Sequence, residues 1–123
     1  MNIKKYSKNI IYIDNSNSGT NKKNTIFIIN YVIESYKDKN ILLIIGEESK
    51  NICEGFPYDD ILHIINKYYY RVIKFIVIGK KLYQKIKMKK NIYYSESLEK
   101  SFNIVNKIIK ENEIIISCVK CFR

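Results

Sequence analysis

Short apolar runs alternate along this chain with longer segments in which apolar residues recur every three or four positions. The runs predict β-strands, and the spaced segments predict α-helices. The predicted strands are 9–13, 41–45, 72–78, 91–94 and 113–117. The predicted helices are 25–36, one that begins near Asp59 or Asp60, 80–88, and one capped by Ser95 or Ser97. Residues 1–8 are polar and lysine-bearing, and no element is assigned to them.

Three of the predicted helices carry a clear apolar stripe, which is the face expected in the core. The stripes consist of Ile26, Ile29, Ile33 and Tyr36, then Ile61, Ile64, Ile65 and Tyr68, and finally Leu98, Phe102, Val105 and Ile109. The run 41–45 is apolar at every position, which is typical of a strand covered on both faces. We therefore predict one α/β domain over residues 1–123. It has three layers, with a mostly parallel, Rossmann-like sheet of five or six strands and helices on both faces.

Ligands of such sheets bind at the carboxyl ends of the strands. Two predicted strands end directly in a glycine, at Gly46 and Gly79, where the chain turns into a loop. The segments expected at this edge are 14–24, 46–58, 79–81 and 118–123.

The chain has 123 residues, the size of one domain, and its 46% hydrophobic content supports a buried core. No apolar run approaches the roughly 20 residues that a membrane helix needs. Three cysteines do not make an even disulfide framework. We expect a cytoplasmic protein that does not contact a membrane.

The formal net charge is +10, but only Arg71 and Arg123 are arginines and the other cations are lysines. Arginine is the usual residue for contacts with bases and phosphates. We therefore expect solvated lysine surfaces, and binding of nucleic acid or another anion stays an alternative.

The segment from Asp14 to Asn21 carries a carboxylate, several amides and hydroxyls, and Gly19. The start of the helix that follows it would offer free N–H groups to an anion. Neither the GxxxxGK(S/T) pattern of a P-loop nor the GxGxxG dinucleotide pattern occurs in the chain. The residues alone leave two interpretations open: an Asn-rich turn without a ligand, and a ligand-binding loop.

Cys118 and Cys121 form a CxxC pair near the end of the chain. A zinc site needs four ligands, and the sequence gives no reason to bring Cys53 and His63 to this pair. A redox pair normally opens a helix, for which too few residues follow. We interpret the pair as part of a structural tail, which can still place Lys120 or Arg123 near an anion.

Three further groups have a structural interpretation. Glu47 and Glu48 follow a predicted strand, and we interpret them as a solvated pair. His63 falls off the buried stripe of its helix, so a surface or packing role is expected. The tyrosines 68–70 are interpreted as a helix end that packs into the core.

With the strands placed, the run from Asp14 to Gly19 resembles a motif of the Mur ligase family, which forms amide bonds with ATP. The motif follows the first strand of the family's C-terminal domain and lies against the bound nucleotide. Asp14 matches its aspartate, and Asn17 matches its His or Asn. The strand ends at Ile45-Gly46-Glu47 and Val77-Ile78-Gly79-Lys80 and the strand 113–117 resemble further parts of this domain. The DNxNSGTN form and the SCVKCFR ending look most like the branch that matures coenzyme F-430.

The resemblance implies that residues at the carboxyl edge bind nucleotide or substrate. These are Asp14, Asn15, Asn17, Ser18, Gly19, Thr20, Gly46, Glu47, Lys120 and Arg123. It implies ATP and Mg²⁺ held through a separate ATPase domain or subunit, a small-molecule substrate, and activation of a carboxylate as an acyl phosphate.

The chain departs from the family in lacking the central ATPase domain with its P-loop, and the loop lacks the family's proline and aromatic residue. We therefore assign it no catalytic residue. We expect a fragment, one piece of a split enzyme or a degenerate copy, and a stand-alone binding or regulatory module stays the alternative.

Overall fold

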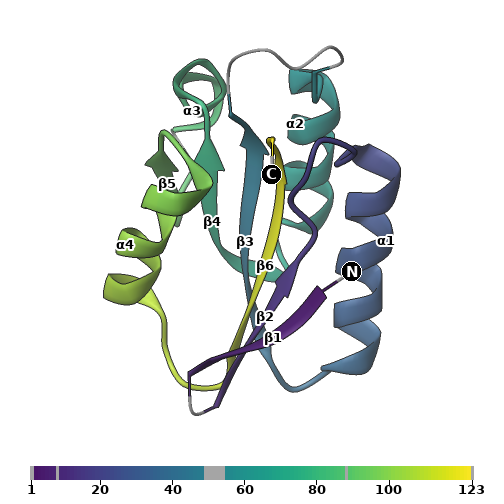
Figure 1. Cartoon of the computed structure of the whole chain (residues 1–123), viewed down its shortest axis with the longest axis vertical. Helices are drawn as coiled ribbons and strands as arrows, with labels where there is room; N and C mark the ends of the chain where they lie inside the picture. The colour runs from purple at the N-terminus through teal and green to yellow at the C-terminus, as the bar shows by residue number, and fades with distance from the viewer. Residues whose placement is uncertain (1, 8, 49–54, 88, 123) are drawn as a thin grey trace.

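The last strand of the chain lies in the middle of the sheet. The computed structural model describes residues 2–7, 9–48, 55–87 and 89–122. Within them, six strands form one sheet in the order β1-β2-β6-β3-β4-β5 (Figure 1). The strands are β1 (Asn2–Ser7), β2 (Ile10–Asp14), β3 (Asn40–Glu47), β4 (Val72–Ile78), β5 (Ile92–Ser95) and β6 (Glu113–Lys120). The helices are α1 (Lys22–Ser35), α2 (Tyr58–Tyr68), α3 (Lys80–Ile86) and α4 (Leu98–Ile108).

Helices cover both faces of this sheet, which confirms the predicted three-layer α/β architecture. β1 is antiparallel to β2, and all other neighbouring strands are parallel. The helices α1, α2 and α3 pack against one face, and α1 and α2 lie side by side there (Figure 1). α4 packs against the other face. Alternate side chains of β3 enter the two cores, with Leu43 in the first and Leu42 in the second, so this strand is apolar throughout.

Strand β1 was not predicted. Five of its six residues are exposed, so this edge strand has no apolar alternation that a sequence pattern can reveal. β1 is held in the sheet by backbone pairing with β2 and by an ion pair between Lys4 and Asp14. Both contacts exist only once β2 is in place.

Among the element boundaries that differ from the prediction, two bear on the candidate site. α1 begins at Lys22 instead of residue 25, because Asn21 and Asn24 form a reciprocal capping box at its start. β6 continues to Lys120 instead of ending at residue 117, because it pairs along β3 as far as Glu47.

The buried faces of the helices follow the predicted stripes in part. The predicted stripe of α2 is confirmed, and Ser97 caps α4. The N-cap of α2 is Pro57, so the prediction of a side-chain cap by an aspartate was wrong. The fully buried residues of α1 are Thr25, Ile28, Ile29 and Val32, of which only Ile29 belongs to the predicted stripe. The other predicted residues, Ile26, Ile33 and Tyr36, are partly buried and pack against the same core. None of the described helices combines the length and apolar character needed to cross a membrane.

Candidate functional site

The carboxyl ends of β2, β6 and β3 lie side by side at one edge of the sheet. β6 pairs with both neighbours, so Asp14 lies opposite Ser117, and Glu47 lies opposite Lys120. The loop that leads to α1 and the residues after β6 leave the sheet at this edge (Figure 1). Predicted site residues from the two ends of the chain are therefore brought together, whereas Arg123 lies outside the described residues.

Asp14 is buried, and both of its carboxylate oxygens have partners. Oδ1 accepts hydrogen bonds from the Ser16 N–H at 3.0 Å and from the Ser117 hydroxyl at 3.1 Å. Oδ2 lies 3.8 Å from Nζ of Lys4. The Ser117 hydroxyl in turn lies 2.7 Å from the phenol oxygen of Tyr12. Asp14 therefore connects the first turn of the loop to the neighbouring strand β6.

Hydrogen bonds inside the loop hold its backbone in one shape. Asn17 Oδ1 accepts the Gly19 N–H at 2.7 Å, and the Asn17 N–H donates to Thr20 Oγ1 at 3.0 Å. The Thr20 hydroxyl donates to the backbone oxygen of Asn15 at 2.7 Å. Asn17, Ser18 and Gly19 are exposed, whereas Thr20 is buried. The loop therefore presents a short polar segment whose shape is held by its own hydrogen bonds.

Two asparagines that the sequence analysis did not single out tie this loop to α1. Asn24 Nδ2 donates to the backbone oxygen of Gly19 at 2.9 Å, and Asn24 Oδ1 accepts from Asn15 Nδ2 at 3.1 Å. Asn24 Oδ1 also accepts the Asn21 N–H, and Asn21 Oδ1 accepts the Asn24 N–H at 3.0 Å. The spacing of three residues between the two side chains is that of a capping box, which is the signal that identifies them.

Lys120 is buried at 7% exposure beneath the loop. Its ammonium donates to the backbone oxygen of Ser18 at 2.7 Å and to that of Thr20 at 3.4 Å. The ion pairs found among the described residues do not include it. The Cys121 N–H donates to the backbone oxygen of Asn17 at 3.2 Å, which extends the contact between loop and strand. The end of β6 thus supports the loop with a cation and a backbone bond.

Glu47 and Glu48 each accept a hydrogen bond from a backbone N–H. Glu47 Oε2 accepts the Phe56 N–H at 2.7 Å, and Glu48 Oε2 accepts the Leu98 N–H at 2.6 Å. Leu98 is the first residue of α4, where a carboxylate also meets the positive end of the helix dipole. Both side chains are partly buried. The interpretation of a solvated pair was wrong, because each carboxylate is partly buried and accepts a hydrogen bond from a backbone N–H.

At this edge β3 and β4 approach each other so closely that only a glycine fits at position 46. Gly46 has a φ of +146°, and a Cβ added to it would lie 2.2 Å from the backbone oxygen of Ile78. A side chain at this position would therefore separate the ends of β3 and β4.

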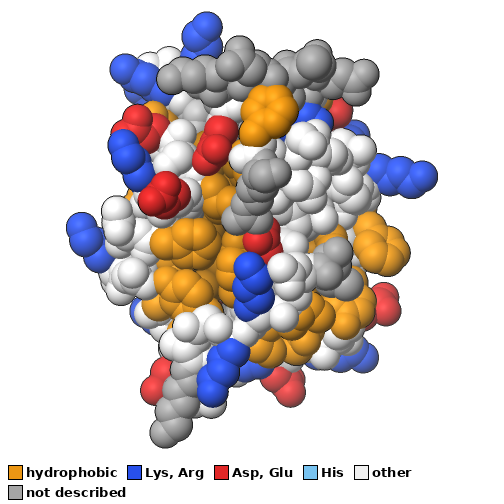
Figure 2. Space-filling view, viewed as in Figure 1, with side chains coloured by type: hydrophobic (Ala, Val, Ile, Leu, Met, Phe, Trp, Pro, Cys, Tyr) orange, Lys and Arg blue, Asp and Glu red, His pale blue; other side chains and the backbone are white. Residues whose placement is uncertain are grey.

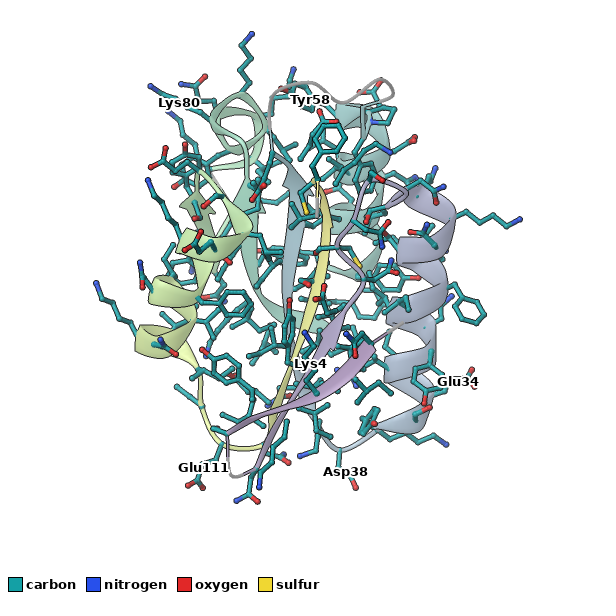
Figure 3. The ribbon with its side chains drawn as sticks, viewed as in Figure 1. Lys4, Glu34, Asp38, Tyr58, Lys80 and Glu111 are labelled. Carbon is teal, nitrogen blue, oxygen red and sulfur yellow. The ribbon has the colours of Figure 1, made fainter. Side chains whose placement is uncertain are left out.

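A groove of about 620 Å³ opens beside it, at the carboxyl ends of β3, β4 and β5. Its lining includes Glu47, Glu48, Tyr58, Lys80, Tyr94 and Lys100. Tyr58 and Lys80 lie at this edge, opposite the edge that carries Asp38 and Glu111 (Figure 3). Figure 2 shows acidic and basic side chains together over α3 and α4. The groove thus offers both signs of charge and two partly exposed phenol rings.

Cys118 and Cys121 are both buried. Burial raises the pKa of Cys118 to about 12, so its thiol is neutral at physiological pH. Cys118 belongs to β6 and not to a tail, whereas Cys53 lies outside the described residues. Among the described residues, no group of three or more His, Cys, Asp or Glu side chains is arranged to hold a metal ion.

The two remaining groups lie on α2 and just after it. His63 is exposed, as predicted. Of the three tyrosines, Tyr68 is buried in the core, whereas Tyr70 is 88% exposed. The predicted packing of this segment is thus confirmed for Tyr68 and wrong for Tyr70.

The family model described as "Coenzyme F430 synthetase CfbE, C-terminal domain" matches residues 4–121. This chain belongs to that family. The match includes most of β1, the loop after β2 and all of β6, so it covers most of the candidate site as well as the fold. It agrees with the resemblance that the loop and the end of the chain indicate.

A curated relative shows the same relationship at the level of sequence identity. The coenzyme F(430) synthetase of Methanosarcina acetivorans is 30% identical over 117 residues, which cover 93% of this chain. Those residues are 24% of the relative, so the chain spans about a quarter of the length of the protein that it matches. No solved structure gave a significant match.

Proposed function

We propose that this chain supplies the C-terminal domain of an ATP-dependent coenzyme F-430 synthetase of the Mur ligase type. The observation that carries the proposal is the family match over residues 4–121. That match supports a role in the biosynthesis of coenzyme F-430. The relative is about four times as long as this chain, and the proposal assigns the ATPase region to the part that the chain does not match.

The exposed part of the loop suits an anionic ligand that accepts and donates hydrogen bonds. Asn17, Ser18 and Gly19 are exposed at the carboxyl edge, next to the start of α1. Lys22 and Lys23 lie in the first turn of α1, which contains no acidic residue, and they add to the positive end of the helix dipole. These residues fit ATP, and we propose that Asn17 and Ser18 contact it. When bound, ATP would supply the phosphoryl group that activates a carboxylate.

Asp14 and Lys120 are positioning residues in this proposal. Asp14 fixes the start of the loop, and the Lys120 ammonium binds the backbone oxygens of Ser18 and Thr20. A loop already in its bound shape loses less conformational entropy when a ligand arrives. Mg²⁺ and the phosphate-binding groups are assigned to the ATPase region. The groove lined by Glu47 is proposed to contact the small-molecule substrate.

The first test is a titration of the chain with Mg-ATP, observed by heteronuclear NMR. We expect shifts in residues 14–20 and at the carboxyl ends of β3 and β6. Asn17→Ala removes an exposed side chain and should abolish the shifts. Asn66→Ala, which changes an exposed asparagine on α2, is the matched control and should leave them unchanged. Binding that survives Asn17→Ala would support a stand-alone module instead.

The second test measures ligase activity after the chain is mixed with the ATPase-containing region of the synthetase. For this test, the ATPase-containing region is cloned from the genome that encodes this chain and is produced as a separate recombinant polypeptide. We expect ATP-dependent product only when both are present. A mixture that forms no complex and no product would reject the proposal.

A further inference from the structure

The solvent-facing side of α1 carries aromatic residues that the core does not use. Phe27 is 66% exposed, and Tyr31, four residues later on the same side, is 36% exposed. The core face of this helix consists of Thr25, Ile28, Ile29 and Val32. Phe27 therefore contributes little to the fold, and its ring stays in water.

A hollow of about 500 Å³ lies against the ring of Phe27. Its lining consists of Asn21, Lys23, Asn24, Ile26, Phe27 and Asn30. We call these residues together with Tyr31 the Phe27 surface. An exposed aromatic ring beside a hollow lined by both apolar and polar side chains is an arrangement found at protein–protein contacts.

The Phe27 surface is continuous with the candidate site. Asn24, which lines the hollow, donates to the backbone oxygen of Gly19 and accepts from Asn15 Nδ2. A body that rests on this surface would therefore lie beside the exposed loop. The same contacts would transmit a change in the position of α1 to the loop.

We propose that the Phe27 surface docks the part of the synthetase that this chain does not match, so that the loop is held against that part. The inference rests on the proposed function. Its occupant is chosen on two grounds: the chain corresponds to 24% of its relative, and the surface adjoins the site loop. The complementary surface is an apolar socket for the ring, with acidic groups opposite Lys22 and Lys23 at the positive start of α1.

A second copy of the chain is the less favoured occupant. Each chain carries a formal net charge of +10, and this charge opposes self-association at low ionic strength. A dimer through this surface would also cover the side of α1 next to the loop. Self-association is therefore treated as an outcome of the test.

The test compares Phe27→Ala with Tyr70→Ala, which removes an exposed ring beyond the end of α2. Binding of each full chain to the separately expressed ATPase-containing region is measured by isothermal titration calorimetry. Thermal unfolding and sedimentation of each chain alone serve as controls. We expect Phe27→Ala to weaken binding about 30-fold or more, as for a buried aromatic at an interface. Tyr70→Ala should bind within about 3-fold of the unsubstituted chain, and both variants should remain folded.

Taken together, the outcomes distinguish a failure of the proposed function from a failure of the docking surface alone. If the unsubstituted chain does not bind the region at all, the proposed function fails and the docking surface fails with it. If Phe27→Ala binds as tightly as the unsubstituted chain, the docking surface is refuted while the proposed function stands. If the unsubstituted chain dimerises and Phe27→Ala does not, a second copy is the occupant and the proposal is overturned.

Discussion

Gly46 provides the sharpest test of how the carboxyl edge is built. In Gly46→Ala the new Cβ would lie 2.2 Å from the backbone oxygen and 2.8 Å from the backbone nitrogen of Ile78. Both atoms belong to the backbone of β4 and cannot move aside without disturbing the sheet. The φ of +146° is in addition a conformation that residues with a side chain rarely adopt.

The size of the effect follows from these two contributions. A strained φ costs about 1–3 kcal/mol. Forcing β3 and β4 apart costs about 1–3 kcal/mol more, as other overpacked substitutions do. We therefore expect the free energy of unfolding to fall by about 2–6 kcal/mol, a large part of the stability of about 5–15 kcal/mol that is typical of a domain.

The matched control is Gly79→Ala. Gly79 also has a positive φ, of +117°, but an added Cβ would meet no atom closer than 3.7 Å. Gly79→Ala therefore reports the strain of φ without the clash. Urea unfolding followed by circular dichroism measures both variants, and a difference of about 2 kcal/mol moves the midpoint by about 1 M. Equal midpoints for Gly46→Ala and Gly79→Ala would refute the steric reasoning.

Three further predictions concern buried charge, pH and helix capping. Lys74→Met will lower the free energy of unfolding by about 3–5 kcal/mol, because Nζ lies 3.1–3.2 Å from both carboxylate oxygens of Glu113, which is 1% exposed. Urea unfolding checks this, and adding Glu113→Gln should recover part of the loss. Burial raises the pKa of Cys118 from 9.0 to about 12, so its contribution to stability is complete below pH 9.0 and declines as the pH rises towards 12. The unfolding free energy of Cys118→Ala will therefore fall less steeply above pH 9.0 than that of the unsubstituted chain, and equal slopes would contradict the assignment. Glu48→Ala will cost about 1 kcal/mol, because the Leu98 N–H loses its acceptor. Hydrogen exchange at the Leu98 amide should become faster. An unchanged rate would contradict a stabilising hydrogen bond from Leu98 to Glu48.

The sequence pattern predicted those features that depend on neighbouring residues. The stripe of α2 and the continuous run of β3 each bury residues at a spacing that the chain itself displays. The position of the loop after β2 followed from the strand before it and the helix after it. The capping box of Asn21 and Asn24 was equally local, and the signal for it was present but not used.

Features that depend on strand order could not be predicted in this way. Asp14 meets Ser117, and Lys120 meets Ser18, across about 100 residues of chain, because β6 inserts between β2 and β3. No local pattern shows that a lysine near the end of the chain is buried beneath a loop near its beginning.

The sequence by itself determined that this protein is an α/β domain with a mostly parallel sheet, and it located the loop at the carboxyl edge. Periodicity and strand–loop–helix order are properties of neighbouring residues, so they can be recognised in the sequence alone. Only the tertiary structure decided that Glu47 and Glu48 are bound by backbone groups, that an exposed lysine-bearing segment forms β1, and that Phe27 is left in water. These results depend on which distant backbone and side-chain groups the packed sheet brings within hydrogen-bond distance.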